Sequence, residues 1–284
     1  MLRIVTDGGA DFPEGWEALY DIYTIPLRIQ FGDRTYLQGY DIGPWNFYQL
    51  VRERREIPRT SLPSPGQIIE FYHNIAQKGD NILSIHLGSK LSGTYSAVQL
   101  AAQELANDES NGINIFPFDS GAGSAILAMM CRDARLLDRA GASIQDILNK
   151  LATIREKLTV VFTLDTLDFA RMNGRVNALQ KALTSVLHIK PIVILRDGLL
   201  QMADRVRTRQ KAIDQIINFA SNRVGKLPVN VAVVHAADPQ MAHWLMDKVR
   251  ELFNCRELLL TDLSIPVAAN LGPGAVGIMV YPVD

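Results

Sequence analysis

The sequence predicts a protein of two α/β domains, and three observations support this fold class. In the first half, short β-rich runs alternate with stretches of helical periodicity, which is typical of a parallel sheet with helices on both faces. In the second half, a hairpin signal predicts a mixed or antiparallel sheet with helices. The chain has 284 residues, 48% hydrophobic and 21% charged, which suits two globular domains. We expect an N-terminal domain at 1–157 and a C-terminal domain at 158–284.

The first half contains three clear strand candidates, and polar turns with helices follow two of them. The turns at the carboxyl ends of parallel strands meet at one edge, where open α/β sheets usually bind ligands. The expected strands are Leu2–Thr6, Asn81–His86 and Ile113–Phe118, and the expected helices are Gln67–Gln77, Ser92–Ala106 and Gly123–Arg139.

The pattern changes after a helix expected at Ile144–Lys157. A strand at Leu158–Leu164 and a helix ending near Leu187 follow, and the turn Arg196-Asp197-Gly198 then joins the strands of a hairpin. The remaining expected elements are the strands Val229–His235, Glu257–Thr261 and Val276–Tyr281 and the helix Met241–Phe253.

Charge and cysteine content exclude several classes of protein. Lys and Arg number 29 and Asp and Glu number 30, so the chain lacks the basic excess of a nucleic-acid-binding protein. Cys131 and Cys255 are too few for a disulfide framework, which favours a cytoplasmic location. No apolar run reaches the roughly 18 residues of a transmembrane segment. Transient contact with a membrane remains open.

Motifs for nucleotides, metals and hydrolysis are incomplete. Gly272–Gly277 spells G-x-G-x-x-G, but the residues after it predict a terminal strand rather than the helix that a nucleotide site requires. Asp7, Asp11 and Asp119 gather at one sheet edge, where capping of backbone amides is favoured over a metal site because no phosphate loop accompanies them. The G-x-S-x-G motif is absent and the histidines lack zinc-site spacing. We therefore expect no metal and no cofactor.

Two hydroxyl-rich segments, Arg59–Gly66 and Leu87–Tyr95, lie before or at the start of predicted helices. Each can be explained by helix capping alone. Taken together they could close around one anion, and neutral hydroxyl and amide donors suit a carboxylate better than a triphosphate.

Basic residues in the second half form another candidate feature. Arg175 follows a polar turn at Asn173-Gly174, and Arg207 lies in a basic run before a predicted helix. Either residue could be part of a solvated surface, or could neutralise an anion held between the domains.

These stretches resemble, in order, the DegV family of bacterial fatty-acid-binding proteins. The resemblance spans nearly the whole chain through the motifs Val5–Asp11, Ile25-Pro26-Leu27, Thr60–Pro65, Lys90–Tyr95, Asn173-Gly174-Arg175, Ile189-Lys190-Pro191 and Gly272-Pro273-Gly274. It implies a protein, not itself an enzyme, that holds one long-chain fatty acid between two domains. The residues that it implies at the carboxylate are Thr60, Ser61, Ser92 and Gly93.

The resemblance also implies a partner. In kinase-linked members, a separate kinase phosphorylates the bound carboxylate, and Arg175 and Arg207 match arginines assigned to partner docking or to the polar network of the head group. Asn270 stands where many relatives carry histidine and cannot take a proton as histidine does.

Two other functions stay open from the sequence. One is a stand-alone hydrolase or phosphotransferase that uses Ser92 or the edge formed by Asp7 and Asp119. The other is a lipid-sensing or scaffolding protein without any phosphorylation, which the replacement of histidine by Asn270 keeps possible.

Overall fold

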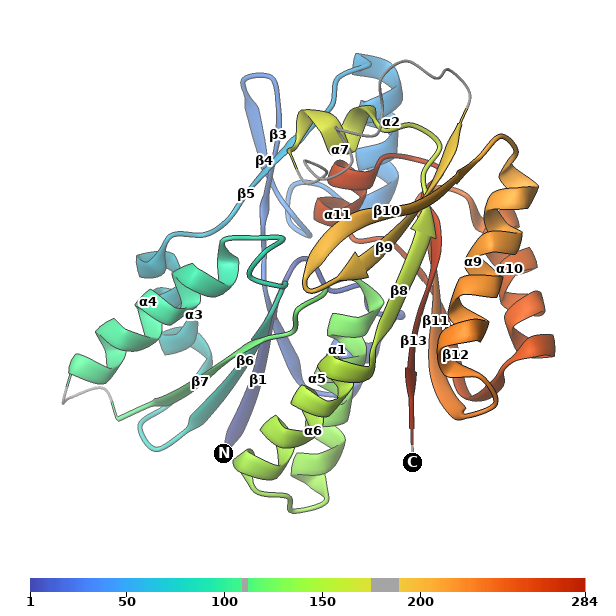
Figure 1. Cartoon of the computed structure of the whole chain (residues 1–284). Helices are drawn as coiled ribbons and strands as arrows, with labels where there is room; N and C mark the ends of the chain where they lie inside the picture. The colour runs from blue at the N-terminus through green and yellow to red at the C-terminus, as the bar shows by residue number, and fades with distance from the viewer. Residues whose placement is uncertain (109–111, 175–188, 284) are drawn as a thin grey trace.

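A computed structural model describes residues 1–108, 112–174 and 189–283 and shows alternating layers of helices and sheets (Figure 1). Helices α3 (Pro65–Ile75) and α4 (Thr94–Asn107) cover the outer face of a first sheet. Helices α5 (Ala125–Arg139) and α6 (Ile144–Lys157) lie between this sheet and a second one. The outer face of the second sheet is covered by α9 (Arg209–Val224) and α10 (Pro239–Leu252).

The first sheet is parallel throughout, as predicted, in the order β2-β1-β6-β7. Its strands are β1 (Leu2–Asp7), β2 (Ile22–Ile25), β6 (Asn81–His86) and β7 (Asn114–Asp119). Successive side chains of a strand point to opposite faces, so Ile4 packs toward α5 while its neighbour Val5 packs toward α3 and α4. Both faces are therefore buried, which explains the continuous apolar runs in the sequence.

The helix signals in the sequence are local and strong. Helix α6 begins with a capping box, in which the Ser143 hydroxyl accepts from the Asp146 amide and the Asp146 carboxylate accepts from Ser143. Its buried residues Ile147, Leu151 and Ile154 recur at helical spacing. These features explain why the predicted bounds of α6 agree with the structure.

The second sheet is mixed, as predicted, in the order β10-β9-β8-β13-β11-β12. Only β11 and β12 pair in parallel. Asp197 and Gly198 have φ values of 53° and 75° in the turn that joins β9 and β10, which confirms the predicted hairpin. The strands are β8 (Thr159–Thr163), β9 (Lys190–Arg196), β10 (Leu199–Val206), β11 (Pro228–His235), β12 (Asn254–Asp262) and β13 (Val276–Pro282).

A third, small antiparallel sheet was not predicted. Its strands are β3 (Arg28–Phe31), β4 (Arg34–Leu37) and β5 (Arg59–Ser61), and α2 (Pro44–Arg54) lies between β4 and β5 in the chain. Further short helices are α1 (Trp16–Leu19), α7 (Asp168–Met172) and α11 (Ile265–Leu271). The predicted helix ending near Leu187 lies outside the described residues. The chain passes from the first sheet to the second after α6, and a domain boundary at residue 157 stays a prediction.

Arg135 of α5 ties this helix to the edge of the first sheet, which leads to a prediction about stability. Its guanidinium is almost fully buried and donates to the backbone oxygens of Tyr20 (2.9 Å), Leu2 (3.1 Å) and Asp21 (3.0 Å). Arg135→Ala should lower the free energy of unfolding by about 2–4 kcal/mol, because it leaves these acceptors unpaired. Urea denaturation measures the change.

Arg139 provides the control, because it lies one helical turn later and is exposed. In the described part of the chain, its guanidinium donates a single hydrogen bond, to the backbone oxygen of Leu19. Arg139→Ala should cost less than about 1 kcal/mol. Equal losses in the two variants would contradict a special role for Arg135.

Candidate functional site

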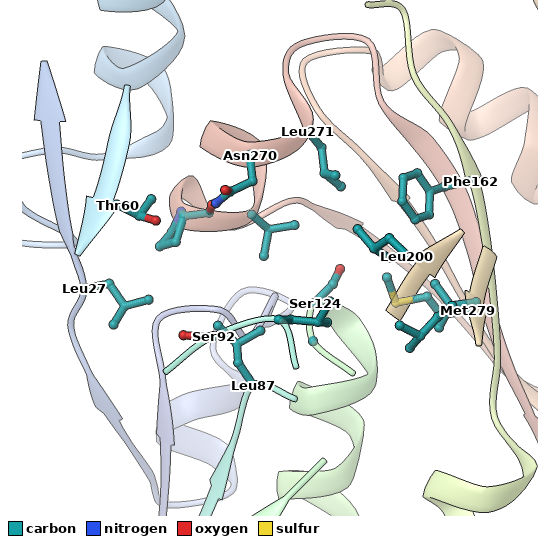
Figure 2. Close-up of a pocket in the computed structure, with 16 residues that line it drawn as sticks. Leu27, Thr60, Leu87, Ser92, Ser124, Phe162, Leu200, Asn270, Leu271 and Met279 are labelled. Atoms are coloured by element: carbon teal, nitrogen blue, oxygen red, sulfur yellow. The ribbon is translucent and has the colours of Figure 1, made fainter. Parts of the chain in front are cut away.

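A pocket of about 120 Å³ lies where the first and second sheets face each other (Figure 2). One side of it comes from β5 and from loops at the carboxyl ends of β2, β6 and β7. The other side comes from β8, β9, β10, β13 and α11. The predicted ligand-binding edge of the parallel sheet thus forms half of a pocket whose other half comes from the second sheet and α11.

Thr60 reaches the pocket from β5. Strand β5 pairs with β3 so that Thr60 stands opposite Ile29, which is fully buried. The capping explanation for this loop also holds, but for another residue: the Ser64 hydroxyl accepts from the amide of Gln67 (3.3 Å) and caps α3. The loop therefore divides its hydroxyls between a helix cap and the pocket.

Ser92 reaches the pocket from the loop between β6 and α4. Its hydroxyl lies 2.9 Å from the Thr94 hydroxyl and accepts from the Thr94 amide (3.3 Å). Because Thr94 is fully buried, this pair fixes the side chain of Ser92. A serine hydroxyl held in this way keeps the capacity to give or to accept a further hydrogen bond.

Asn270 is the third polar group at this end of the pocket and comes from α11. Figure 2 shows its amide on the same side of the pocket as Thr60. Gly272 and Gly274 follow with φ values of 80° and 82°, and a Cβ at Gly272 would lie 2.6 Å from the ring of Phe169. The predicted role of these glycines in a tight loop is confirmed, as is the terminal strand after them.

The opposite end of the pocket is apolar. Phe162, Leu200 and Met279 lie there, away from the three polar groups (Figure 2). Phe162 and Met279 belong to the inner face of the second sheet, since β8 and β13 alternate between the two faces. A smaller cavity of about 30 Å³ lies beyond and shares Phe162, Leu271 and Met279 with the pocket.

Asp11 and Ser124 join the two sides of the pocket, and sequence analysis missed this connection. The Ser124 hydroxyl, beside the pocket, donates to one carboxyl oxygen of Asp11, and the amide of Ser264 donates to the other (2.8 Å). Ser264 directly precedes α11, which carries Asn270. Ser124 has a φ of 64°, a strained value for serine that these contacts maintain.

Other predicted residues occupy varied positions. Ser61, Gly93 and Arg207 are exposed and do not line the pocket, although the first two adjoin Thr60 and Ser92. Arg175 lies outside the described residues. The side-chain amide of Asn173, at the end of α7, donates to the backbone oxygens of Pro58 (3.2 Å) and Ala269 (3.0 Å). It therefore connects α7 with both sides of the pocket.

The acidic edge does what the capping interpretation predicted. Asp7 accepts from the amides of Gly9 (2.9 Å) and Leu87 (3.0 Å). Asp119 accepts from the amides of Ser89 (3.1 Å) and Gly121 (2.9 Å). Both carboxylates therefore shape the loops around the pocket, and the described residues contain no group of three His, Cys, Asp or Glu placed to hold a metal ion.

Comparison with known proteins identifies the relatives of this fold and pocket. The DegV family model, described as an uncharacterised protein family, matches residues 1–283. The chain belongs to the DegV family. A DegV domain-containing protein from Streptomyces coelicolor is 32% identical over 281 residues, which cover 98% of each chain.

Two solved DegV structures have the same fold over 99% of both chains. A DegV family protein from Thermus thermophilus, described by its fatty acid binding, is 28% identical with a TM-score of 0.89. DegV from Bacillus subtilis, a fatty acid binding protein, is 27% identical with a TM-score of 0.89.

A buried polar chain in this DegV family member was also missed from the sequence. Tyr72 lies 2.7 Å from Ser84, Ser84 lies 2.6 Å from His86, and His86 lies 2.9 Å from Asp7. All four side chains are 0% exposed, so Ser84, His86 and Asp7 cannot reach a substrate as a catalytic triad would. Ser84 and His86 are two apart on β6 and point to one face, which was the only signal available in the sequence.

The buried carboxyl group of Asp11, which accepts from Ser124 and Ser264, predicts an unusual dependence of stability on pH. Burial raises the pKa of Asp11 from 3.8 to about 7. The folded state therefore binds a proton that the unfolded state has lost, and the free energy of unfolding should fall as pH rises from about 4 to 7. At about 1.4 kcal/mol per pH unit, this contribution has a ceiling of roughly 4 kcal/mol. Urea denaturation across this range measures it.

Asp11→Asn keeps the side-chain shape and removes the titration, so its stability should lack this decline. Burial lowers the pKa of His235, which makes stability rise with pH and is common to both proteins. The difference between wild type and Asp11→Asn therefore isolates Asp11. A constant difference between the two proteins at all pH values would contradict the prediction.

Proposed function

We propose that this protein binds one long-chain fatty acid, with its tail in the apolar end of the pocket and its head group between Thr60 and Ser92. The observation that carries the proposal is the segregation of the pocket into a polar end, with Thr60, Ser92 and Asn270, and an apolar end, with Phe162 and Met279. Fatty acid binding by the related Thermus thermophilus and Bacillus subtilis proteins supports it.

The energetics assign different tasks to the two ends. A tail of about fourteen methylenes, at roughly 0.8 kcal/mol each, offers on the order of 11 kcal/mol before the cost of ordering the ligand. The few polar groups contribute less binding free energy, and they instead determine the orientation of the bound ligand. Affinity should therefore follow chain length, and orientation should follow the hydroxyls.

The structure gives no support to the stand-alone enzyme. In the described part of the chain, the Ser92 hydroxyl forms hydrogen bonds with Thr94, and none joins it to a histidine. Asp7 and Asp119 are occupied by backbone amides. No described helix is long and apolar enough to cross a membrane. The low cysteine content supports our proposal of a cytoplasmic location.

Native mass spectrometry of gently purified protein tests the proposal directly. We expect one fatty acid per chain, identified after solvent extraction. Protein that carries no lipid and takes up none when it is added would overturn the proposed function.

The head-group assignment predicts the effect of removing both hydroxyls. Thr60→Val combined with Ser92→Ala should weaken fatty acid binding by about 1–3 kcal/mol, because hydrogen bonds to a desolvated head group are lost. Competition with a fluorescent fatty acid measures the dissociation constants.

Ser96→Ala serves as the matched control, since Ser96 is an exposed serine of α4 and does not line the pocket. Its affinity should equal that of wild type. Unchanged affinity in the double variant would place the head group elsewhere.

We further propose that a separate kinase phosphorylates the bound fatty acid, as the resemblance to kinase-linked members implies. Arg175→Ala should then leave lipid affinity nearly unchanged but reduce the formation of acyl phosphate, measured by hydroxylamine trapping with the purified kinase. Arg250→Ala is the control, because Arg250 is an exposed arginine paired with Asp247 on α10. Equal loss of lipid affinity and phosphorylation would instead make Arg175 a head-group residue.

A further inference from the structure

Asn270 presents a hydrogen-bond acceptor without a donor at the polar end of the pocket. Its Nδ2 donates to the backbone oxygen of Pro266 (2.7 Å). Because a carbonyl oxygen only accepts, this contact fixes the orientation of the amide and directs Oδ1 away from Pro266. Oδ1 is buried and has no hydrogen-bond partner in the described part of the chain. A ligand that satisfies Asn270 must therefore donate a hydrogen.

The described lining of the pocket offers no charge to a ligand. None of its described lining residues is ionisable. The elements packed around the polar end carry charged groups, but none of the described ones lines the pocket. The carboxyl groups have other partners: Asp11 accepts from Ser124 and Ser264, and Asp168 accepts from Thr166. Among the basic groups, Arg28 donates to Gln67, Lys90 donates to the backbone oxygen of Asp197, and Arg59 and Arg171 are exposed. Among the described residues, a carboxylate would thus lack a cation partner and would face the lone pairs of Asn270.

A comparison of costs favours the neutral acid. Protonating a carboxyl with an ordinary pKa near 4.3 at pH 7 reduces affinity by a factor of about 500. Burying an ion without a partner is disfavoured by more than this, which is why buried carboxyl groups commonly become protonated instead. The hydroxyls of Thr60 and Ser92 can serve either form, since each can donate or accept.

We propose that the pocket selects lipids with an uncharged, hydrogen-donating head group: the protonated fatty acid, a fatty alcohol or a primary fatty amide. The donor hydrogen of the head group binds Asn270 Oδ1, and its oxygen accepts from Thr60 or Ser92. This inference rests on the proposed function for the place of the ligand, and goes beyond it in the class of head group.

The test compares dodecanoic acid, dodecanol and dodecanamide, which share one tail, at concentrations where each is monomeric. Calorimetry between pH 6 and 8.5 should show that the acid loses affinity about tenfold per pH unit, as its neutral form is depleted. The alcohol and the amide should each bind with an affinity that does not change with pH. At pH 7 each should bind at least as tightly as the acid, because neither has to take up a proton. Since the alcohol does not titrate, it also reports any effect of protein groups such as Asp11.

Variants of Asn270 make the test specific to this residue. Asn270→Leu removes the acceptor and should weaken the alcohol and the amide about three- to tenfold. Asn270→His introduces a group that can donate to a carboxylate, so the acid should lose less affinity at high pH. Thermal unfolding confirms that each variant folds, and Ser96→Ala, at an exposed position of α4 outside the pocket, is the control.

The outcomes separate this inference from the proposed function. Acid affinity that is constant with pH, together with alcohol and amide binding more than about a hundredfold weaker, would overturn the neutral head group while leaving fatty acid binding intact. Failure of the wild type to bind any of the three lipids would overturn the proposed function itself.

Discussion

The pocket depends on one buried carboxyl group, that of Asp11. It accepts hydrogen bonds from Ser124 at the start of α5 and from Ser264 at the start of α11, and so holds the two sides of the pocket at a fixed separation. Removing this group from water is unfavourable, and the hydrogen bonds that it accepts offset part of that cost. The same contacts maintain the left-handed backbone of Ser124, which an isolated loop would not adopt.

The two sheets supply different chemistry because their architectures differ. A parallel sheet brings the loops after its strands to one edge, so the first sheet contributes backbone amides, hydroxyls and the carboxylates that order them. The second sheet turns a face toward this edge, and the side chains on that face, including Phe162 and Met279, are apolar. The pocket has a polar end and an apolar end because the edge of the first sheet lies opposite a face of the second sheet.

Much of the fold could be predicted from the sequence, because its signals are local. Helix α6 has a capping box and regular apolar spacing, and the hairpin after β9 has an Asp-Gly turn. Thr60 and Ser92 could be singled out because each lies in a short hydroxyl-rich motif. Asp11 and Ser264, in contrast, are 253 positions apart, and no local pattern reports their contact. The strands of the small sheet were missed because they have only three or four residues each, too few for a clear alternation.

The position of β13 has a consequence for how the chain folds during synthesis. This strand is the last of the second sheet in sequence, yet it lies between β8 and β11. Until it is made, β10-β9-β8 and β11-β12 remain separate, and β8 and β11 expose unpaired edges that can pair with other chains. Met279 belongs to the same strand, so a lipid cannot find a complete pocket on a nascent chain. A ligand present in the cell would therefore act as a stabiliser of the finished fold rather than as a template for its early steps.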